Sequence, residues 1–228
     1  MFCVNFILTY WASHMAPSAI IALAFTSLIY FNMFFGKQFL AIPFDKKVIM
    51  GGLISFFGMG LLSYNELIHI DEHAGYLLGF FISLIATASA SVGNIISVRS
   101  RQLKIPILAN NAWGMLYGCL FSLTFCLVTQ KSFTIKPDLS FTLSFLYLVI
   151  FGTVISFGAY LKLIDLVGPA KAAFTSVISP VIAITLSIYF ENLNFNSWMI
   201  FGVGFSLLGN IIALTPKSWL LGKFRHGN

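Results

Sequence analysis

The sequence predicts an all-α integral membrane protein with about eight transmembrane helices, built from two inverted five-helix repeats of which the first is incomplete. Three observations lead to this prediction. Of the 228 residues, 58% are hydrophobic and only 9% are charged, whereas a soluble domain carries about 25% charged residues. Uncharged runs are long enough to cross a bilayer, and residues of the same type recur at one fixed offset. So few charges cannot cover a surface that faces water, so lipid is the expected solvent.

The uncharged runs define the expected helices. A helix needs about 20 residues to cross roughly 30 Å of hydrocarbon, and the runs are continuously apolar, without the alternation of a transmembrane barrel strand. The first run is too long for one helix, and Pro17 beside polar residues marks the expected break. The expected segments cover residues 1–14, 17–36, 48–65, 75–98, 107–129, 141–162, 171–190 and 197–215.

The basic residues between these segments predict the orientation in the membrane. With the C-terminus in the cytoplasm, eleven Lys and Arg residues fall inside and only Lys131 and Lys136 fall outside. Because inside loops are enriched in Lys and Arg, we expect a cytoplasmic C-terminus. The net charge of +6 does not indicate a nucleic-acid partner, since the basic residues form short clusters between apolar runs rather than a groove with interleaved aromatic residues. The expected partner is the lipid bilayer.

A shift of the chain by 151 residues aligns residues of the same type without a gap. The aligned pairs include Phe6 with Phe157, Gly51 with Gly202, Ser55 with Ser206 and Gly58 with Gly209. Loops at equivalent positions carry opposite charge signals, because the loop with Lys37, Lys46 and Lys47 corresponds to residues 191–197, which contain no Lys or Arg. Equivalent loops are therefore expected on opposite sides of the membrane, as in the inverted repeats of many secondary transporters.

This offset makes each repeat about five helices long and sets the expected boundaries. Residues 1–65 form the C-terminal part of the first repeat, 66–74 an external loop, 75–215 a complete second repeat and 216–228 a basic cytoplasmic tail. The first repeat then contains two segments and a short stub. We therefore expect an N-terminal truncation, with roughly two and a half helices missing before Met1.

The second half also carries an ordered set of residues typical of one transporter family. The set comprises Ser91, Asn94, Arg99 and Arg101, then Asn111, Trp113 and Gly118, then Gly152, Thr153, Tyr160 and Gly168, then Ser179, Pro180 and Glu191, and finally Gly202 and Gly209. In this order the residues resemble the EamA domain of the drug/metabolite transporter superfamily, which is built from five plus five helices. The resemblance covers residues 75–215, and residues 5–64 as the tail of a first domain. In that tail Ile29 and Leu40 replace the proline and the glutamate of the family pattern.

Polar residues inside apolar helices are the candidates for a substrate path, because such groups face the bundle interior or an aqueous cavity. Asn94 and Asn111 are two candidates, and hydrogen bonding between helices is their alternative role. Trp113 and Tyr117 share one helix face four residues apart, and an interfacial aromatic belt is their alternative role.

Three further candidates depend on the family resemblance. Tyr10 and Tyr160 lie in the third helices of the two expected repeats, and the resemblance implies that these helices line the central cavity. Packing within the bundle is the alternative role of both tyrosines. Pro180 removes one backbone hydrogen bond and can bend its helix, so we expect it to act as a hinge.

The remaining chemistry is sparse. Residues 69–73, His-Ile-Asp-Glu-His, do not form an HExxH motif and fall in the expected external loop, so we expect no metal site. No phosphate loop of the GxxxxGK[ST] type and no nucleophile turn occurs, and we expect no catalytic residue and no cofactor.

The resulting hypothesis is a secondary transporter that moves a small organic solute across the membrane by alternating access. The family resemblance implies the inner membrane of a bacterium. The alternative is a non-transporting membrane protein, either a truncated remnant or an assembly partner. The sequence leaves a homo-oligomer open, and it does not identify the solute.

Overall fold

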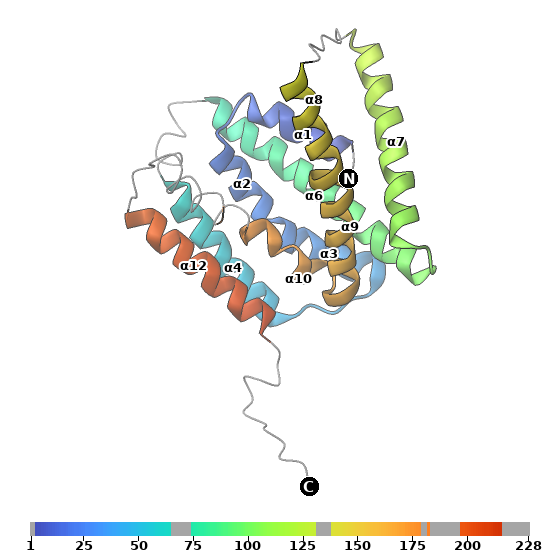
Figure 1. Cartoon of the computed structure of the whole chain (residues 1–228). Helices are drawn as coiled ribbons and strands as arrows, with labels where there is room; N and C mark the ends of the chain where they lie inside the picture. The colour runs from blue at the N-terminus through green and yellow to red at the C-terminus, as the bar shows by residue number, and fades with distance from the viewer. Residues whose placement is uncertain (1–2, 65–73, 131–137, 179–181, 183–196, 216–228) are drawn as a thin grey trace.

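A computed structural model describes residues 3–64, 74–130, 138–178, 182 and 197–215, and every regular element in these ranges is helical (Figure 1). The prediction of an all-helical chain is confirmed for this part of the sequence. The elements are α1 (Val4–Ser13), α2 (Ser18–Thr26), α3 (Leu28–Leu40), α4 (Lys46–Leu62), α6 (Ala74–Gln102), α7 (Ile107–Val128), α8 (Leu139–Tyr147), the π-helical η2 (Leu148–Ile155), α9 (Ser156–Val167), α10 (Pro169–Ala172) and α12 (Ser197–Leu214).

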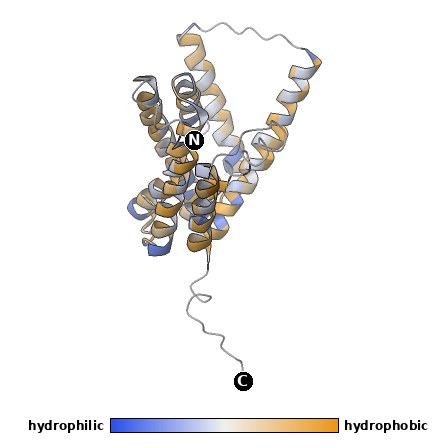
Figure 2. Cartoon of the chain, turned by 90° about the vertical axis from the view of Figure 1, so that its left-hand side faces the viewer, coloured by the Kyte–Doolittle hydropathy of each residue, from blue (hydrophilic) through white to orange (hydrophobic). Residues whose placement is uncertain are grey.

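The helical stretches are long and apolar enough to cross a bilayer at five places in the described part of the chain. These candidate spans cover Ser18–Leu40, Gly75–Gln102, Ile107–Val128, Leu139–Val167 and Ser197–Leu214. Hydrophobic residues, coloured orange, recur along the helices in Figure 2, and many large ones are exposed. Such a surface is suited to lipid rather than to water. The expected segment 171–190 lies mostly outside the described residues, so the count of eight helices stays a prediction.

The expected segment 17–36 is divided into α2 and α3 at Ser27. The Ser27 hydroxyl donates a hydrogen bond of 2.6 Å to the Ala24 carbonyl, and the Thr26 hydroxyl donates one of 2.6 Å to the Leu23 carbonyl. Hydroxyl groups that bond back to the preceding turn compete with the helical ladder and bend the helix. The break was not expected from the sequence, because the run of apolar residues continues through it.

α4 and α12 pack side by side along small residues (Figure 1). A Cβ atom added to Gly202 would lie 2.8 Å from the Gly58 carbonyl oxygen, and one added to Gly58 would lie 2.5 Å from the Ser206 nitrogen. These distances are too short for any side chain, so glycine is what lets the two backbones meet. Gly58 faces Gly202 while Gly51 faces Gly209, so the two helices run antiparallel.

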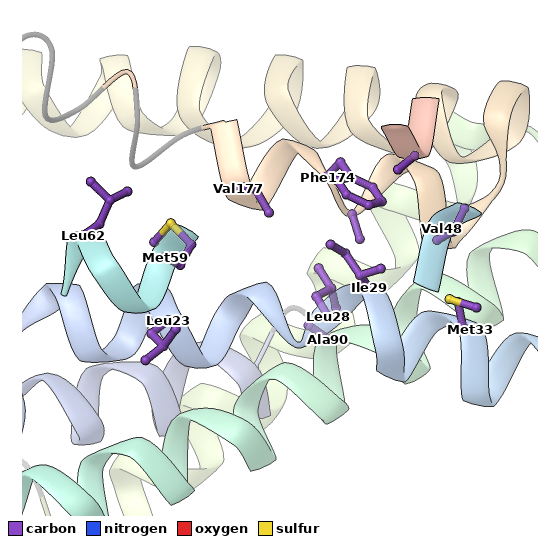
Figure 3. Close-up of a cluster of buried hydrophobic side chains, with 12 residues drawn as sticks. Leu23, Leu28, Ile29, Met33, Val48, Met59, Leu62, Ala90, Phe174 and Val177 are labelled. Carbon is purple, nitrogen blue, oxygen red and sulfur yellow. The ribbon is translucent and has the colours of Figure 1, made fainter. Parts of the chain in front are cut away.

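The largest cluster of buried side chains lies between α3, α4 and residues 173–177. Figure 3 shows Phe174 and Val177 directed toward the same region as Ile29 of α3 and Met59 of α4. Ile29, Phe174 and Val177 are all at most 1% exposed. This core joins α2, α3 and α4 of the N-terminal part to α6, α12 and residues 173–177 of the second half of the chain.

Candidate functional site

A cavity of about 300 Å³ lies where helices from both halves of the chain meet. Its lining comes from α1, from the broken helix α2–α3, from α6, from α9 and from the segment after α10. The polar lining residues are Asn5, Thr9, Asn94, Tyr160, Thr175 and Ser176. None of the described residues that line this cavity carries a formal charge. We call it the central cavity.

Two interrupted helices border the central cavity. The first is the break at Ser27 between α2 and α3. The second lies after α10, where the Thr175 hydroxyl donates to the Ala172 carbonyl at 2.9 Å and the Ser176 hydroxyl donates to the Ala173 carbonyl at 2.6 Å. At both interruptions, hydroxyl groups bond back to carbonyls of the preceding turn.

The two interrupted helices also touch each other. The Ser176 hydroxyl lies 3.5 Å from the Phe25 carbonyl oxygen, and both residues line the central cavity. On another wall, the rings of Phe6 and Phe157 meet edge to face, with centroids 6.2 Å apart. The residues of each pair are 151 positions apart.

A buried hydrogen-bond network lies at one side of the central cavity, and Asn32 of α3 is at its centre. The Asn32 carbonyl oxygen accepts from Ser91 at 2.7 Å and from the Asn94 amide at 3.3 Å. The Asn32 amide donates to the Pro169 carbonyl at 2.8 Å, and the Asn94 amide also donates to the Tyr160 hydroxyl at 3.1 Å. We call these five residues the Asn32 network. It ties α3, α6 and α9 to the first residue of α10.

Gly168 permits the turn that brings the Pro169 carbonyl to Asn32. Its φ of 85° lies in the left-handed region, which favours glycine, and it separates α9 from α10. The same turn lines a further cavity of about 280 Å³ together with Asn32, Asp45 and Lys171. This second cavity therefore lies beyond the Asn32 network, at the end of the bundle where the loops carry lysines.

A larger cavity of about 840 Å³ lies at the opposite end, beside the turn between α1 and α2. Thr9, Phe25 and Ser176 line both this cavity and the central cavity. Tyr10, Ser13 and Ser63 also belong to its wall, so we call it the vestibule. Because the two cavities share lining residues, the central cavity is adjacent to the vestibule. It is also adjacent to the Asn32 network, because Asn94 and Tyr160 belong to both.

Of the residues that the sequence singled out, two lie together at the central cavity. Asn94 and Tyr160 meet in the central cavity, while Tyr10 lines the vestibule and is 68% exposed. Pro180 lies outside the described residues.

The three candidates on α7 lie away from the central cavity. Trp113 and Tyr117 stack on each other with ring centroids 5.9 Å apart, and both are exposed. Tyr117 lines a separate cavity of about 320 Å³ between α7 and α6. Asn111 is 4% exposed, and its side-chain oxygen has no hydrogen-bond partner.

Asn32 was missed by the sequence prediction although a signal for it exists. It is a polar residue inside a long run of apolar residues, and the same feature made Asn94 a candidate for the substrate path. The described residues contain no group of three or more His, Cys, Asp or Glu side chains that could hold a metal ion. The histidine-containing segment 69–73 lies outside the described part.

Comparisons with known proteins agree on one kind of protein. Residues 77–215 match the EamA-like transporter family. The chain is 27% identical over 190 residues to the uncharacterized inner membrane transporter YedA of Escherichia coli (strain K12), a match that covers 82% of this chain and 59% of that protein. It is 31% identical over 106 residues to the uncharacterized inner membrane transporter YicL of Salmonella typhimurium (strain LT2), which covers 45% of this chain and 31% of that protein.

The fold is also similar to one seen in a crystal structure. The two chains are 15% identical in sequence and superpose with a TM-score of 0.70. The match covers 92% of the present chain and 71% of the other chain. At this identity the likeness concerns the fold alone. The present chain spans about three fifths of the length of YedA, with 59% of that protein covered.

Proposed function

Because the chain belongs to the EamA-like transporter family, whose members are transporters and not enzymes, we propose that it moves a small organic solute across a bacterial inner membrane by alternating access. The proposed substrate site is the central cavity. One observation carries this proposal: two interrupted helices, one from each half of the chain, meet at a cavity that has polar side chains in its lining and no charged ones among the described residues.

We propose that these halves are inverted repeats, with the boundaries 1–65 and 75–215, the external loop 66–74 and the tail 216–228. Three contacts between residues 151 positions apart support this assignment: Phe6 with Phe157, Phe25 with Ser176, and Ser55 with Ser206. In two inverted copies, equivalent residues meet only near the pseudo-two-fold axis that relates the copies. The central cavity would then lie on that axis, where inverted-repeat transporters bind their substrates.

Alternating access requires that one side of the site opens while the other is closed. The vestibule supports access from the end of the bundle that carries the turn 13–18, since it shares Thr9, Phe25 and Ser176 with the central cavity. The Asn32 network would close the opposite side, because it joins three helices and the turn at Pro169. The excess of Lys and Arg at that closed end makes it the cytoplasmic side. The conformation is then open to the outside.

A flux measurement tests the proposed function. Purified protein in liposomes is given a panel of radiolabelled amino acids, amines, sugars and small amides, and uptake is compared with that of empty liposomes. We expect saturable uptake of at least one compound, reduced by Asn94→Leu in the central cavity but not by Thr124→Val on the exposed surface of α7. Folded protein that moves none of the compounds would favour a non-transporting membrane protein instead.

A further inference from the structure

A groove on the outside of the bundle lies between α3 and α6. Its volume is about 290 Å³, and its lining consists of Phe39, Leu40, Val92, Ile95, Ile96 and Arg99. Phe39, Val92 and Ile96 are 65%, 40% and 58% exposed, so the groove is open toward the surrounding lipid. It shares no lining residue with the central cavity. We call it the α3–α6 groove.

The two helices run in the same direction along this groove. The Ser91 hydroxyl of α6 donates to the Asn32 side chain of α3, 59 positions away. One turn further, a Cβ atom added to Gly36 would lie 3.8 Å from Ile95, and one turn beyond that Leu40 lines the groove together with Arg99. The α3–α6 groove therefore ends where both helices end.

The end of the α3–α6 groove lies at the level of the lipid headgroups. The candidate spans Ser18–Leu40 and Gly75–Gln102 both end there. From Val92 to Arg99 the lining extends about 10 Å along α6, at a rise of 1.5 Å per residue. Apolar side chains thus line the part of the groove within the hydrocarbon, and an arginine lies at the interface with water.

Arg99 has no acidic partner within the described part of the chain. The three acidic side chains there bond elsewhere: Asp45 accepts from the Lys47 backbone, Asp138 from the Phe141 backbone, and Asp165 from Arg101 at 3.2 Å. Arg99 is exposed and donates from Nη1 to the Gln102 side chain at 3.1 Å. A guanidinium group has five N–H donors, so donors remain for a ligand.

This combination of groups matches an amphiphile with a negative head. A guanidinium group binds a phosphate through two parallel hydrogen bonds, which makes arginine well suited to phosphate recognition. The exposed apolar side chains below it suit a hydrocarbon chain. In a zwitterionic lipid the headgroup's own cation competes with Arg99 for the phosphate, whereas an anionic lipid keeps a net negative charge that complements the arginine.

We propose that the α3–α6 groove binds one anionic phospholipid of the surrounding bilayer. Arg99 holds the phosphate, and the first part of an acyl chain lies against Phe39, Val92 and Ile96. The inference requires only that the chain lies in a bilayer, so it stands or falls independently of the proposed transport.

Lipid binding to the full chain is measured in detergent by native mass spectrometry, with dioleoylphosphatidylglycerol and dioleoylphosphatidylcholine as probes. We expect the first bound phosphatidylglycerol to have at least about fivefold higher affinity than phosphatidylcholine, because one basic side chain at the headgroup level contributes about this factor. Equal affinities of the two lipids for the folded protein would overturn the proposal.

Arg99→Gln is expected to abolish the preference for phosphatidylglycerol. Without the arginine, the α3–α6 groove ends at the C-terminal carbonyls of two helices, whose partial negative charge repels an anion. Lys46→Gln is the matched control, because it removes one positive charge at the start of α4, at the same end of the bundle, from a residue that does not line the groove. An equal loss in both variants would show that affinity follows the total charge, and the site would be wrong.

Val92→Trp tests the apolar part of the α3–α6 groove. The larger side chain should occupy the place of the acyl chain and lower the affinity for phosphatidylglycerol about fivefold while Arg99 is retained. Ile85→Trp is the control, since Ile85 lies two turns earlier on α6, is 60% exposed and does not line the groove. Unchanged affinity in Val92→Trp, or displacement of the lipid by an equal concentration of glycerol 3-phosphate, would leave a headgroup contact and no groove site. A lipid-free dimer that Val92→Trp dissociates would instead make this groove an interface between two copies and overturn the proposal.

Discussion

The hydroxyl group of Ser55 lies 3.3 Å from the carbonyl oxygen of Ser206, and these two serines are 151 positions apart in the chain. Each serine is followed three residues later and preceded four residues earlier by a glycine, so α4 and α12 present the same small-residue pattern to each other. Between membrane helices, close approach over small residues replaces the hydrophobic driving force that is absent in lipid. The α4–α12 interface is therefore expected to be sensitive to single added methyl groups.

Gly202→Ala is expected to destabilise the protein. The added Cβ atom would lie 2.7 Å from Leu62 Cγ and 2.8 Å from the Gly58 carbonyl oxygen, and the second of these is backbone that cannot rotate away. Overpacking of this kind costs about 1–3 kcal/mol. The apparent melting temperature of the detergent-solubilised protein should fall accordingly.

The control for this substitution lies on the same helix. A Cβ atom added to Gly204 meets nothing within 4 Å, so Gly204→Ala should leave stability unchanged or raise it by up to about 1 kcal/mol, because alanine has the higher helix propensity. A similar loss of stability in both variants would show that α4 and α12 do not approach each other as described.

The membrane spans could be predicted from the sequence, because they depend on local composition. The packing of α4 against α12 over glycines was not predicted, although a signal for it exists. Apolar length predicts a membrane helix, and the glycines of the repeat recur at a fixed offset. The pairing of Asn94 with Tyr160 was not predicted, although both residues were singled out. Their contact depends on how α6 packs against α9, which local pattern does not specify.

Other features escaped the sequence prediction for a different reason. The break at Ser27 and the π-helical turns of η2 depend on which carbonyl a hydroxyl group selects. In η2 the Thr153 hydroxyl bonds to the Leu148 carbonyl five residues earlier, at 2.9 Å. In many helices a serine or threonine hydroxyl bonds to the preceding turn and the helix continues. The presence of such a residue in an apolar helix therefore does not locate a break.

Asn32→Leu is expected to open the closed side of the central cavity. The substitution removes one donor and one acceptor and leaves the Pro169 carbonyl and the Ser91 hydroxyl buried without their partner. The loss of buried hydrogen bonds costs about 1–3 kcal/mol, and it falls on the contacts that hold the proposed cytoplasmic side shut.

Thiol labelling measures this opening. Thr9→Cys is introduced into protein whose free cysteines, Cys3, Cys119 and Cys126, are replaced by alanine. A membrane-impermeant maleimide should label it in right-side-out vesicles and, only when Asn32→Leu is also present, in inside-out vesicles. Asn210→Leu is the matched control, since Asn210 is a buried asparagine on α12 that bonds to Ser206 and lies outside the Asn32 network. Labelling from both sides without Asn32→Leu would contradict closure by the network.

Tyr160→Phe is expected to weaken solute binding several-fold with a small effect on stability. The change removes the hydroxyl that accepts from Asn94 and keeps the ring in the wall of the cavity. A single neutral hydrogen bond contributes about 0.5–1.5 kcal/mol, so the Asn94 amide gains freedom to turn away from the cavity without loss of the fold. Binding and melting temperature are measured on the same sample. Tyr147→Phe is the control, because Tyr147 is exposed and stacks on Phe151 away from the cavity. An equal effect of both substitutions on solute binding would argue against a role of Tyr160 in the site.

Reporter fusions test the orientation on which the proposal of an outward-open conformation depends. A reporter placed after Lys104 or after Asn228 should be active in the cytoplasm, and one placed after Asp71 should be active outside, because eleven of the thirteen Lys and Arg residues then face the cytoplasm. Lys104 follows α6, and residue 71 lies between α4 and α6, so these two fusions report on opposite ends of the same span. Replacement of Arg99, Arg101 and Lys104 by glutamine should weaken the cytoplasmic signal after α6, while the same change of Lys131 and Lys136 should not. A cytoplasmic reporter at Asp71 in the unmodified chain would reverse the orientation, and with it the assignment of the vestibule to the outside.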